Sequence, residues 1–272
     1  MKKVKVFLYF LVSLAVLLAS GCGGGDVKKQ EAKPAPKAEA AKVLKVGMDA
    51  AYPPFGSQDI KTKEYVGFDV DIIKAIGEAE GFSVTIHNIP FDGLIPALQA
   101  GNIDVAINDI TINEDRAKSV DFSKRYYIAG LGVVVKKDNN SIKTEKDLEG
   151  KRLGVSIGST GEEAARKIPA AKLKVFNQLN EAFLELKNSG VDAVINDIPT
   201  NEYYVNTTGK NDVKTVELAL TREDLGIAVK KGNKELLGKI NSGLQKIKKN
   251  GEFTKLYQKW FGKEPLKELL TE

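Results

Sequence analysis

The stretch DVAINDI at residues 104–110 returns as DAVINDI at residues 192–198, and this internal repeat decides the fold. The copies match in residue type at every position, start 88 residues apart (at 104 and 192), and each follows a helix-like segment that ends in glycine. A short apolar run bounded by turn residues is typical of a strand buried in a parallel sheet. The repeat therefore predicts two α/β units of one kind, the alternative being a coincidence between common α/β sequences.

Strand and helix patterns alternate ahead of each copy, which gives the order strand-helix-strand-helix-strand twice. The expected segments are residues 43–48, 68–80, 82–86, 92–100 and 103–107 in the first unit and residues 152–156, 159–168, 173–176, 181–187 and 192–195 in the second. Helical spacing then covers residues 233–249 and 252–260, and two crossings, near 128–133 and 222–227, predict a hinge of two strands. Ligands of open α/β sheets bind beyond the carboxyl ends of the strands, so the two Asn-Asp-Ile endings should face a shared cleft.

The N-terminal residues have the layout of a secretory signal. Lys2, Lys3 and Lys5 precede an apolar run from Val6 to Ala19, whose 14 residues are fewer than the roughly 20 that span a bilayer. The run leads into Leu-Ala-Ser-Gly-Cys22, which resembles the lipobox at which bacterial signal peptidase cuts and the cysteine receives lipid. We expect a signal peptide over residues 1–21 and lipid on Cys22, the alternative being an unpaired cysteine after an ordinary signal.

The segment after Cys22 is expected to be a tether. Residues 23–42 contain no aromatic side chain, two prolines and many small or charged residues, so they cannot bury enough surface to offset their ordering entropy. The expected organisation is a signal peptide at 1–21, the lipidated cysteine and linker at 22–42, lobe 1 at 43–130, lobe 2 at 131–223, a return to lobe 1 at 224–264 and a tail at 265–272.

Composition excludes several classes of function. The chain has 41 Lys and Arg against 36 Asp and Glu; without the three signal-peptide lysines, 38 against 36 leave a charge of +2, far from the basic bias of a nucleic-acid-binding protein. One cysteine and one histidine give little material for a disulfide framework, a metal site or a catalytic triad. The sequence has no Gly-x-x-x-x-Gly-Lys run for binding ATP. We expect no catalytic residue, no metal and no cofactor.

Seven motifs follow one another along residues 43–262: Asp49-Ala-Ala-Tyr52-Pro-Pro-Phe55, Gly67-Phe68-Asp69-Val-Asp71, Phe91-Asp-Gly93-Leu-Ile-Pro96-Ala-Leu98, Thr111-x-x-x-x-Arg116, Asp121-Phe122-Ser123, Gly158-Ser-Thr-Gly161 and Trp260-Phe261-Gly262. Together they resemble the polar amino-acid-binding proteins of ABC importers, the family 3 extracellular solute-binding proteins. The resemblance implies an α/β fold of the two-lobed, periplasmic-binding-protein-like type II, with two open sheets joined by a two-stranded hinge. It also implies a monomer outside the cytoplasm, lipid-anchored to the cell membrane, which binds a free amino acid and is recognised by a permease.

A buried amino acid zwitterion needs a cation or N–H donors for its carboxylate and an anion for its ammonium. The planar guanidinium of Arg116 suits the carboxylate, and the resemblance places it there, beside Thr111 and the backbone of Asp109. A surface arginine in a charged helix is the alternative. Asp197 ends its strand where the repeat predicts a cleft residue, and it should take the ammonium, cap the helix after Pro199, or do both.

Residues of both units should surround the rest of the ligand. Ser159, Thr160 and Gly161 open a helix whose free N–H groups form an anion site, although plain N-capping also explains a Ser-Thr pair. The resemblance implies that Tyr52 and Phe91 stack on the ligand side chain; aromatic residues without such a motif are more often core. Contacts from both lobes would favour the closed form over the open one.

The specificity of the cleft depends on Asp49, Asp109, Ser156 and Asn196, which offer carboxylates, a hydroxyl and an amide. These groups favour a polar or basic amino acid, namely arginine, lysine or glutamine. Asp109 stands where the family commonly has glycine, alanine or serine, and its carboxylate should repel that of the ligand unless it points elsewhere.

Two other functions remain open on the same scaffold. Cyclohexadienyl dehydratases resemble this family and work in the same cleft, where Asp49 or Asp109 would have to serve as a general acid or base. The other is a lipid-anchored sensor or adhesin that uses the same ligand site.

Overall fold

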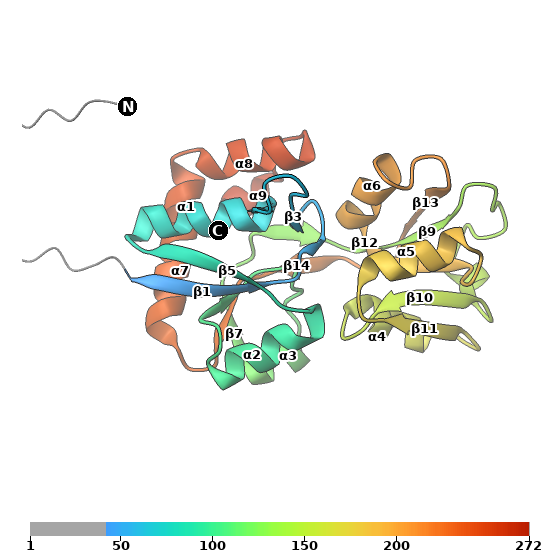
Figure 1. The fold of residues 1–272 in the computed structure, drawn as a ribbon, viewed down its shortest axis with the longest axis horizontal. Helices are drawn as coiled ribbons and strands as arrows, with labels where there is room; N and C mark the ends of the chain where they lie inside the picture. Colours follow the sequence, from blue (N-terminus) through green and yellow to red (C-terminus); the bar gives the residue numbers. More distant parts are fainter. Residues whose placement is uncertain (1–41, 272) are drawn as a thin grey trace, which may run out of the picture. The chain divides into compact units, whose positions relative to one another are not determined.

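A computed structural model describes residues 42–271 of the 272-residue chain. The predicted signal peptide, the lipidation site Cys22 and all of the predicted tether except Lys42 lie outside the described residues. Residues 42–271 form two five-stranded sheets that carry helices, and we name the body around the first sheet lobe 1 and the body around the second lobe 2 (Figure 1). The class is α/β with two lobes, as the sequence predicts.

The two sheets have the same plan. The strand order in lobe 1 is β5 (Ser83–Asn88), β1 (Val43–Met48), β6 (Val105–Ala106), β15 (Ala228–Lys230) and β7 (Val120–Phe122). In lobe 2 it is β11 (Lys172–Phe176), β10 (Arg152–Ser156), β12 (Ala193–Asp197), β9 (Leu131–Lys136) and β13 (Val213–Ala219). In each sheet the first strand of the unit pairs in parallel with the second and the third. A strand from outside the unit, β15 in lobe 1 and β9 in lobe 2, pairs antiparallel with the third.

The sequence repeat corresponds to the third strand of each unit, β6 and β12. The Oδ2 atom of Asp104 accepts a hydrogen bond from the backbone N–H of Lys45 on β1 at 2.8 Å, and that of Asp192 accepts one from Arg152 on β10 at 2.9 Å. Both copies thus attach their strand to the first strand of the unit with the same side chain. The repeat is therefore structural as well as sequential.

Helices cover both faces of each sheet. Those of lobe 1 are α1 (Phe68–Glu80), the 3-10 turn η1 (Phe91–Gly93), α2 (Leu94–Ala100), α3 (Glu114–Ser119), α7 (Lys234–Lys249), α8 (Glu252–Phe261) and α9 (Lys267–Leu270). Those of lobe 2 are the 3-10 turn η2 (Glu145–Leu148), α4 (Thr160–Lys167), α5 (Leu179–Lys187) and α6 (Ile198–Asn206). In Figure 1, α1 and α8 lie on one side of the lobe 1 sheet and α2 and α3 on the other, and each side buries an apolar cluster of its own.

The predicted elements are found with small differences. Strand β1, helix α1 and strand β10 have the predicted bounds. The helix predicted over residues 92–100 begins instead as the 3-10 turn η1. Pro96 has no N–H to donate to the carbonyl of Asp92 four residues earlier, so this turn cannot close as an α-helix.

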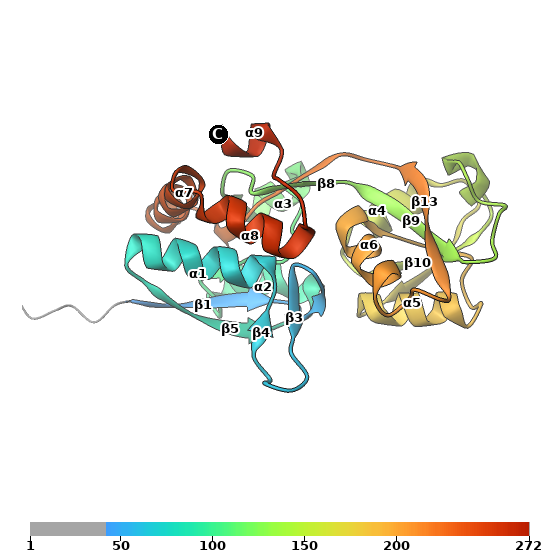
Figure 2. The same cartoon turned by 90° about the horizontal axis from the view of Figure 1, so that it is seen from above.

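Two antiparallel strands join the lobes, as predicted. Strand β8 (Tyr127–Ala129) pairs with β14 (Glu223–Leu225), with Glu223 opposite Ala129. Figure 2 shows the two segments crossing side by side between the lobes. A small three-stranded sheet of β2 (Ala51–Tyr52), β3 (Gly56–Gln58) and β4 (Tyr65–Val66) belongs to lobe 1.

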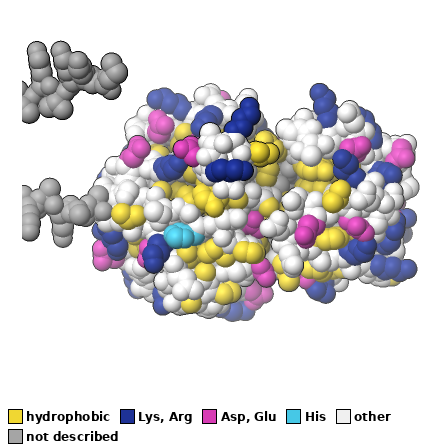
Figure 3. Space-filling model, in the orientation of Figure 1, with side chains coloured by type: hydrophobic (Ala, Val, Ile, Leu, Met, Phe, Trp, Pro, Cys, Tyr) yellow, Lys and Arg dark blue, Asp and Glu magenta, His cyan; other side chains and the backbone are white. Residues whose placement is uncertain are grey.

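The segment predicted as a tail includes α9, whose Leu269 is buried in the core of lobe 1. On the face shown in Figure 3, basic and acidic side chains are interspersed over both lobes. Within residues 42–271, no helix is both long enough and apolar enough to cross a bilayer.

Candidate functional site

The two copies of the repeat bring Asp109 and Asp197 to the facing ends of the sheets. Asp109 follows β6 with a φ of 53°, in the left-handed region, and its N–H donates to Oδ2 of the fully buried Asp69 on α1 at 2.9 Å. This bond holds an unfavourable turn in place. The turn directs the carboxylate of Asp109 toward lobe 2, where the hydroxyl of Thr200 on α6 donates to its Oδ2 at 3.2 Å.

Asp197 ends β12 and occupies the N-cap position of α6, yet its side chain makes no capping hydrogen bond. Among residues 42–271, the Oδ1 atoms of Asp197 and Asp109 are both buried without a hydrogen-bond partner. Burial raises the pKa of Asp197 above its ordinary value, and the nearby charge of Glu223 raises it further. Burial and then the charge of Asp197 raise the pKa of Asp109 in the same direction. Two carboxyl groups that oppose each other's ionisation hold protons more readily than ordinary aspartates, and a cation bound beside them would favour their ionised forms.

Arg116 lies on α3, whose N-cap Asn113 accepts the N–H of Arg116 at 2.8 Å. Its guanidinium is buried and donates from Nη1 to the carbonyl of Thr111 and from Nη2 to the carbonyl of Gly158 in lobe 2, each at 3.0 Å. Its carbon Cζ lies 5.3 Å from the centre of the Phe91 ring. Burial lowers the pKa of Arg116, but an arginine remains a cation in proteins. Five N–H donors leave room for a carboxylate besides these two carbonyls.

Ser159 is the N-cap of α4, and its hydroxyl is hydrogen-bonded within the protein both as donor and as acceptor, so its presence there needs no ligand. The hydroxyl accepts the N–H of Glu162 at 3.1 Å and donates to the carbonyl of Ser156 at 2.7 Å. A Cβ on Gly161 would stand 2.6 Å from the carbonyl oxygen of Ile195, so glycine is what lets α4 approach β12 so closely. Thr160, the first residue of α4, donates its hydroxyl to Glu223.

Tyr52 and Phe91 form an aromatic wall on the lobe 1 side. Their ring centres are 5.6 Å apart at 33°, and Tyr52 is buried against apolar residues of lobe 2. The hydroxyl of Tyr52 donates to Oγ of Ser156 at the end of β10, at 2.8 Å. Tyr52 and Ser156, both predicted from sequence, therefore meet across the lobes.

Asp49 and Asn196 occupy buried positions near the ends of β1 and β12. The carboxylate of Asp49 accepts the N–H groups of Ala51 and Phe91, each at 3.1 Å, and so shapes the loop that carries the aromatic wall. Burial raises the pKa of Asp49 to about 6, which leaves it ionised at neutral pH. Within residues 42–271, the Nδ2 atom of Asn196 is buried without a partner.

The structure adds residues that the sequence did not single out. Glu223 on the hinge strand β14 accepts the hydroxyls of Thr111, Thr160 and Thr221. Thr200 meets Asp109 from lobe 2, and Asn108 accepts the N–H of Asp49 at 2.8 Å. Asn108 belongs to the repeat, so the sequence could have indicated it as a site residue. Nothing in the local sequence distinguishes Glu223 from other hinge residues.

The charged residues at the facing ends of the two sheets suit one kind of ligand. Carboxylates from both lobes and one guanidinium can hold a small zwitterion with an additional cationic group. No group of three or more His, Cys, Asp or Glu side chains between residues 42 and 271 has the arrangement of a metal site.

Two α/β lobes on a two-stranded hinge, with buried charged groups of both signs between them, define a two-lobed solute-binding protein. A family model for the bacterial extracellular solute-binding proteins, family 3, matches residues 44–263. The chain belongs to this family.

This chain is similar to known proteins both in sequence and in three-dimensional structure. A probable histidine-binding protein of Neisseria gonorrhoeae is 33% identical over 264 residues, which is 96% of this chain and 97% of that protein. An ancestral arginine-binding protein, solved bound to arginine, is 47% identical with a TM-score of 0.79, covering 82% of this chain and 100% of that one; it has also been solved bound to glutamine. The arginine-, lysine-, histidine-binding protein ArtJ of Geobacillus stearothermophilus is 36% identical with a TM-score of 0.80, covering 85% and 100%.

Proposed function

We propose that this chain is the substrate-binding lipoprotein of an amino-acid ABC importer. It captures a polar or basic amino acid, arginine and lysine in preference to glutamine, by closing its lobes, and it delivers the ligand to a membrane permease. It acts as a monomer on the outer side of the membrane that anchors it. Similarity to proteins named for histidine and arginine binding supports the amino-acid class.

The observation that carries the proposal is the pair of buried carboxylates, Asp109 and Asp197, with unpartnered oxygens on opposite lobes. The ligand ammonium lies against Asp197, and the ligand carboxylate takes free N–H groups of Arg116. Asp109, Asp49 and Glu223 add negative charge that the zwitterion alone does not balance. A ligand with a cationic side chain balances more of this charge than an amide does, so the cleft favours arginine and lysine.

The same charges couple binding to closure. Asp109 belongs to lobe 1 and Asp197 to lobe 2, so closing the lobes brings together two carboxyl groups that repel each other when both are ionised, and this raises their pKa values. A cation between them turns this repulsion into attraction. The ligand therefore binds the closed form better than the open one and shifts the population toward it.

Titration calorimetry with arginine, lysine, glutamine and glutamate tests the ligand class. We expect arginine or lysine to bind at least as tightly as glutamine, and glutamate to bind poorly because like charges repel. Asp49→Asn should weaken cation binding by about 1.5–3 kcal/mol, as for a hydrogen bond to a charged group. Because Asp49 also accepts two loop N–H groups, glutamine is the internal control: a disturbed loop weakens both ligands, whereas a lost charge weakens only the cations.

The exposed Asp138 of lobe 2 supplies a matched control, Asp138→Asn, which removes one negative charge from a residue outside the candidate site. Binding of glutamine alone, with arginine giving no heat, would contradict the cationic preference. It would leave an amide site built on Asn196 and Ser156.

The lipid anchor is tested separately at Cys22. Cells that express the wild type and are fed labelled palmitate should incorporate label into the protein, and Cys22→Ser should abolish incorporation because no thiol remains in the chain. The variant should also leave the membrane fraction, since the acyl chains supply the anchoring energy. Equal labelling of both proteins would refute the anchor.

A buried carboxyl group with a raised pKa also suits acid catalysis, which keeps the dehydratase alternative testable. Incubation with prephenate or arogenate, followed by chromatography of the products, distinguishes the two functions. The binding proposal expects both compounds to be recovered unchanged. A sensor or adhesin would bind the same amino acids without a permease, so uptake by cells lacking this chain separates it from an importer component.

A further inference from the structure

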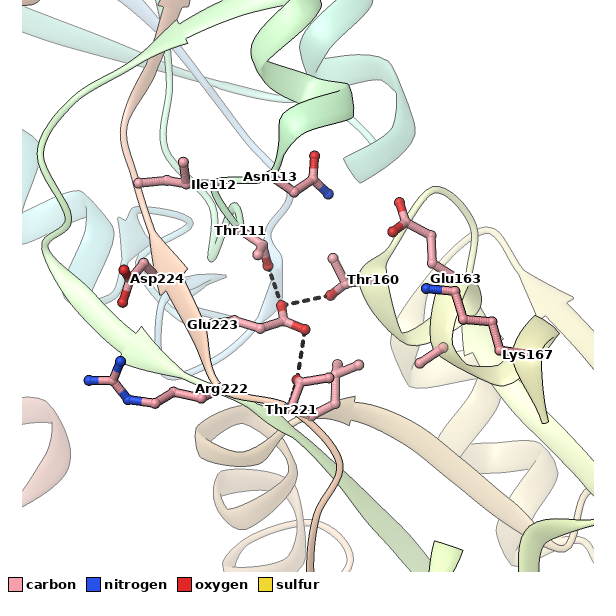
Figure 4. A pocket seen from close by; sticks show the side chains of 12 residues that line it. Thr111, Ile112, Asn113, Thr160, Glu163, Lys167, Thr221, Arg222, Glu223 and Asp224 are labelled. Carbon is pink, nitrogen blue, oxygen red and sulfur yellow. Dashed lines mark hydrogen bonds between the residues drawn. The ribbon is translucent and has the colours of Figure 1, made fainter. Parts of the chain in front are cut away.

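Glu223 is the hinge residue whose side chain contacts both lobes. Its Oε2 atom accepts the hydroxyl of Thr111 in lobe 1 at 2.6 Å and that of Thr160 in lobe 2 at 2.9 Å. Its Oε1 atom accepts the hydroxyl of Thr221 at 2.8 Å. Figure 4 shows the carboxylate between the three threonines, beside a cavity of about 400 Å³. Only 9% of the surface of Glu223 is exposed, so these three hydroxyl donors replace most of the water that would otherwise solvate its carboxylate.

Backbone hydrogen bonds show where the chain passes from one lobe to the other. Before Glu223, the N–H of Leu220 donates to the carbonyl of Leu131 at 2.8 Å, and the N–H of Leu131 donates to Oγ1 of Thr221 at 2.9 Å; these bonds attach the chain to lobe 2. After Glu223, the N–H of Ile112 donates to the carbonyl of Asp224 at 2.8 Å, which attaches the chain to lobe 1. The change of lobe falls at residues 222–223.

The two hydrogen bonds that Oε2 of Glu223 accepts from threonines therefore respond differently to a movement of the lobes. Thr111 forms a β-bridge with Leu225, two residues beyond Glu223, so the Glu223–Thr111 pair moves as one unit with lobe 1. Thr160 begins α4, which packs on β12 in the sheet of lobe 2. A rotation of the lobes about the hinge therefore lengthens the Glu223–Thr160 bond and leaves the Glu223–Thr111 bond intact.

We propose that Glu223 is an interlobe clasp: its carboxylate, positioned by Thr111 and Thr221, holds Thr160 only when the lobes are closed, and so raises the closed-to-open ratio. The consequence for ligand binding rests on the function proposed above, but the clasp itself does not. Because the ligand binds the closed form, its apparent affinity rises in proportion to the closed population. Glu223 is thus a positioning residue that acts through Thr160.

The direct test measures lobe separation without any amino acid. Small-angle X-ray scattering gives the radius of gyration of the full chain. Emission from Trp260, the chain's one tryptophan, gives a second signal, since it lines a hollow of about 190 Å³ together with Pro199 and Tyr203 of α6. For Glu223→Gln and Glu223→Ala we expect the closed-to-open ratio to fall about tenfold, or about 1.4 kcal/mol. The radius should rise and the tryptophan signal should change with it.

Glu217→Gln is the matched control, because it removes the same charge from an exposed position on β13 of lobe 2. The control should leave both signals as in the wild type. Glu223→Gln keeps size and shape, so it stands in if Glu223→Ala fails to fold.

A double-mutant cycle with arginine as the ligand tests the link to binding. Glu223→Gln and Thr160→Val should each weaken arginine binding about tenfold, and the double variant no more than either alone, because both remove one bond. Fully additive losses, or Glu223 variants that match the wild type in both radius and affinity, would overturn the clasp. If the wild type binds no amino acid, the proposed function is wrong, while a larger radius in the Glu223 variants still supports the clasp.

Discussion

Arg116→Ala is expected to weaken amino acid binding by about 3–5 kcal/mol, a hundredfold or more, because it leaves a buried carboxylate without its charged partner. The loss should extend to every amino acid that binds, since all share the α-carboxylate. The structure adds a second cause, the loss of the hydrogen bond from Arg116 to the carbonyl of Gly158 across the lobes. Titration calorimetry measures the loss, and circular dichroism verifies that the variant folds.

Two further variants separate the causes. Arg116→Lys keeps the charge without the planar fork, so it should recover part of the affinity but not the bidentate contact. Arg166→Ala removes an exposed arginine of α4 whose side chain pairs with Glu162 of the same helix, and this variant should bind like the wild type. If Arg116→Ala retains wild-type affinity for every amino acid, the assignment of Arg116 to the ligand carboxylate is wrong.

Arginine binding is also expected to weaken strongly as the pH is lowered from about 8 to about 5, because protons compete with the ligand for the same carboxylates. Burial raises the pKa values of Asp49, Asp109 and Asp197, so the closed protein without a cation holds protons that ordinary aspartates release. A bound cation favours the ionised forms, and binding releases these protons. Each proton released makes the affinity change by up to about tenfold per pH unit.

The stability of the ligand-free closed form should have the opposite pH dependence. A carboxyl group whose pKa is raised by folding contributes stability that is fully present below its unfolded value and is lost as the pH rises through its folded value. The melting temperature without ligand should therefore fall between about pH 5 and about pH 8. The increase in melting temperature that saturating arginine produces should become larger over the same pH interval.

Calorimetry at several pH values, in buffers with different heats of ionisation, measures the number of protons released. Asp197→Asn removes one titrating group, so it should bind arginine more weakly at about pH 8 and show a shallower pH dependence. His87→Gln is the control for the chain's one histidine, which is exposed on β5, and should leave the profile unchanged. An affinity that is independent of pH would contradict a cation site between ionised carboxylates.

Elements with a regular local pattern could be predicted closely from the sequence. The bounds of β1, α1 and β10 agree with the periodicity of their apolar residues, because burial of one face dictates the spacing within an element. The repeat indicated two sheets with equivalent third strands, and their polar endings pointed to Asp109 and Asp197 as residues of one cleft. The helix predicted from residue 92 begins instead as η1, because Pro96 lies inside the predicted segment. Other helix starts shift by one or two residues, as at α5, which begins at Leu179 and not at residue 181.

The sequence by itself thus determined that this chain forms two α/β units on a hinge, and which strand ends carry polar groups, because these properties depend on neighbours a few residues apart. Only the tertiary structure decided the partners of individual side chains: Ser159 caps its helix, Asp49 binds loop N–H groups, and Glu223 joins Thr111 and Thr160. Glu223 is 112 residues from Thr111 and 63 from Thr160. Contacts over such separations are set by how the lobes pack, and a hydroxyl or carboxylate leaves no periodic trace of its partner in the sequence.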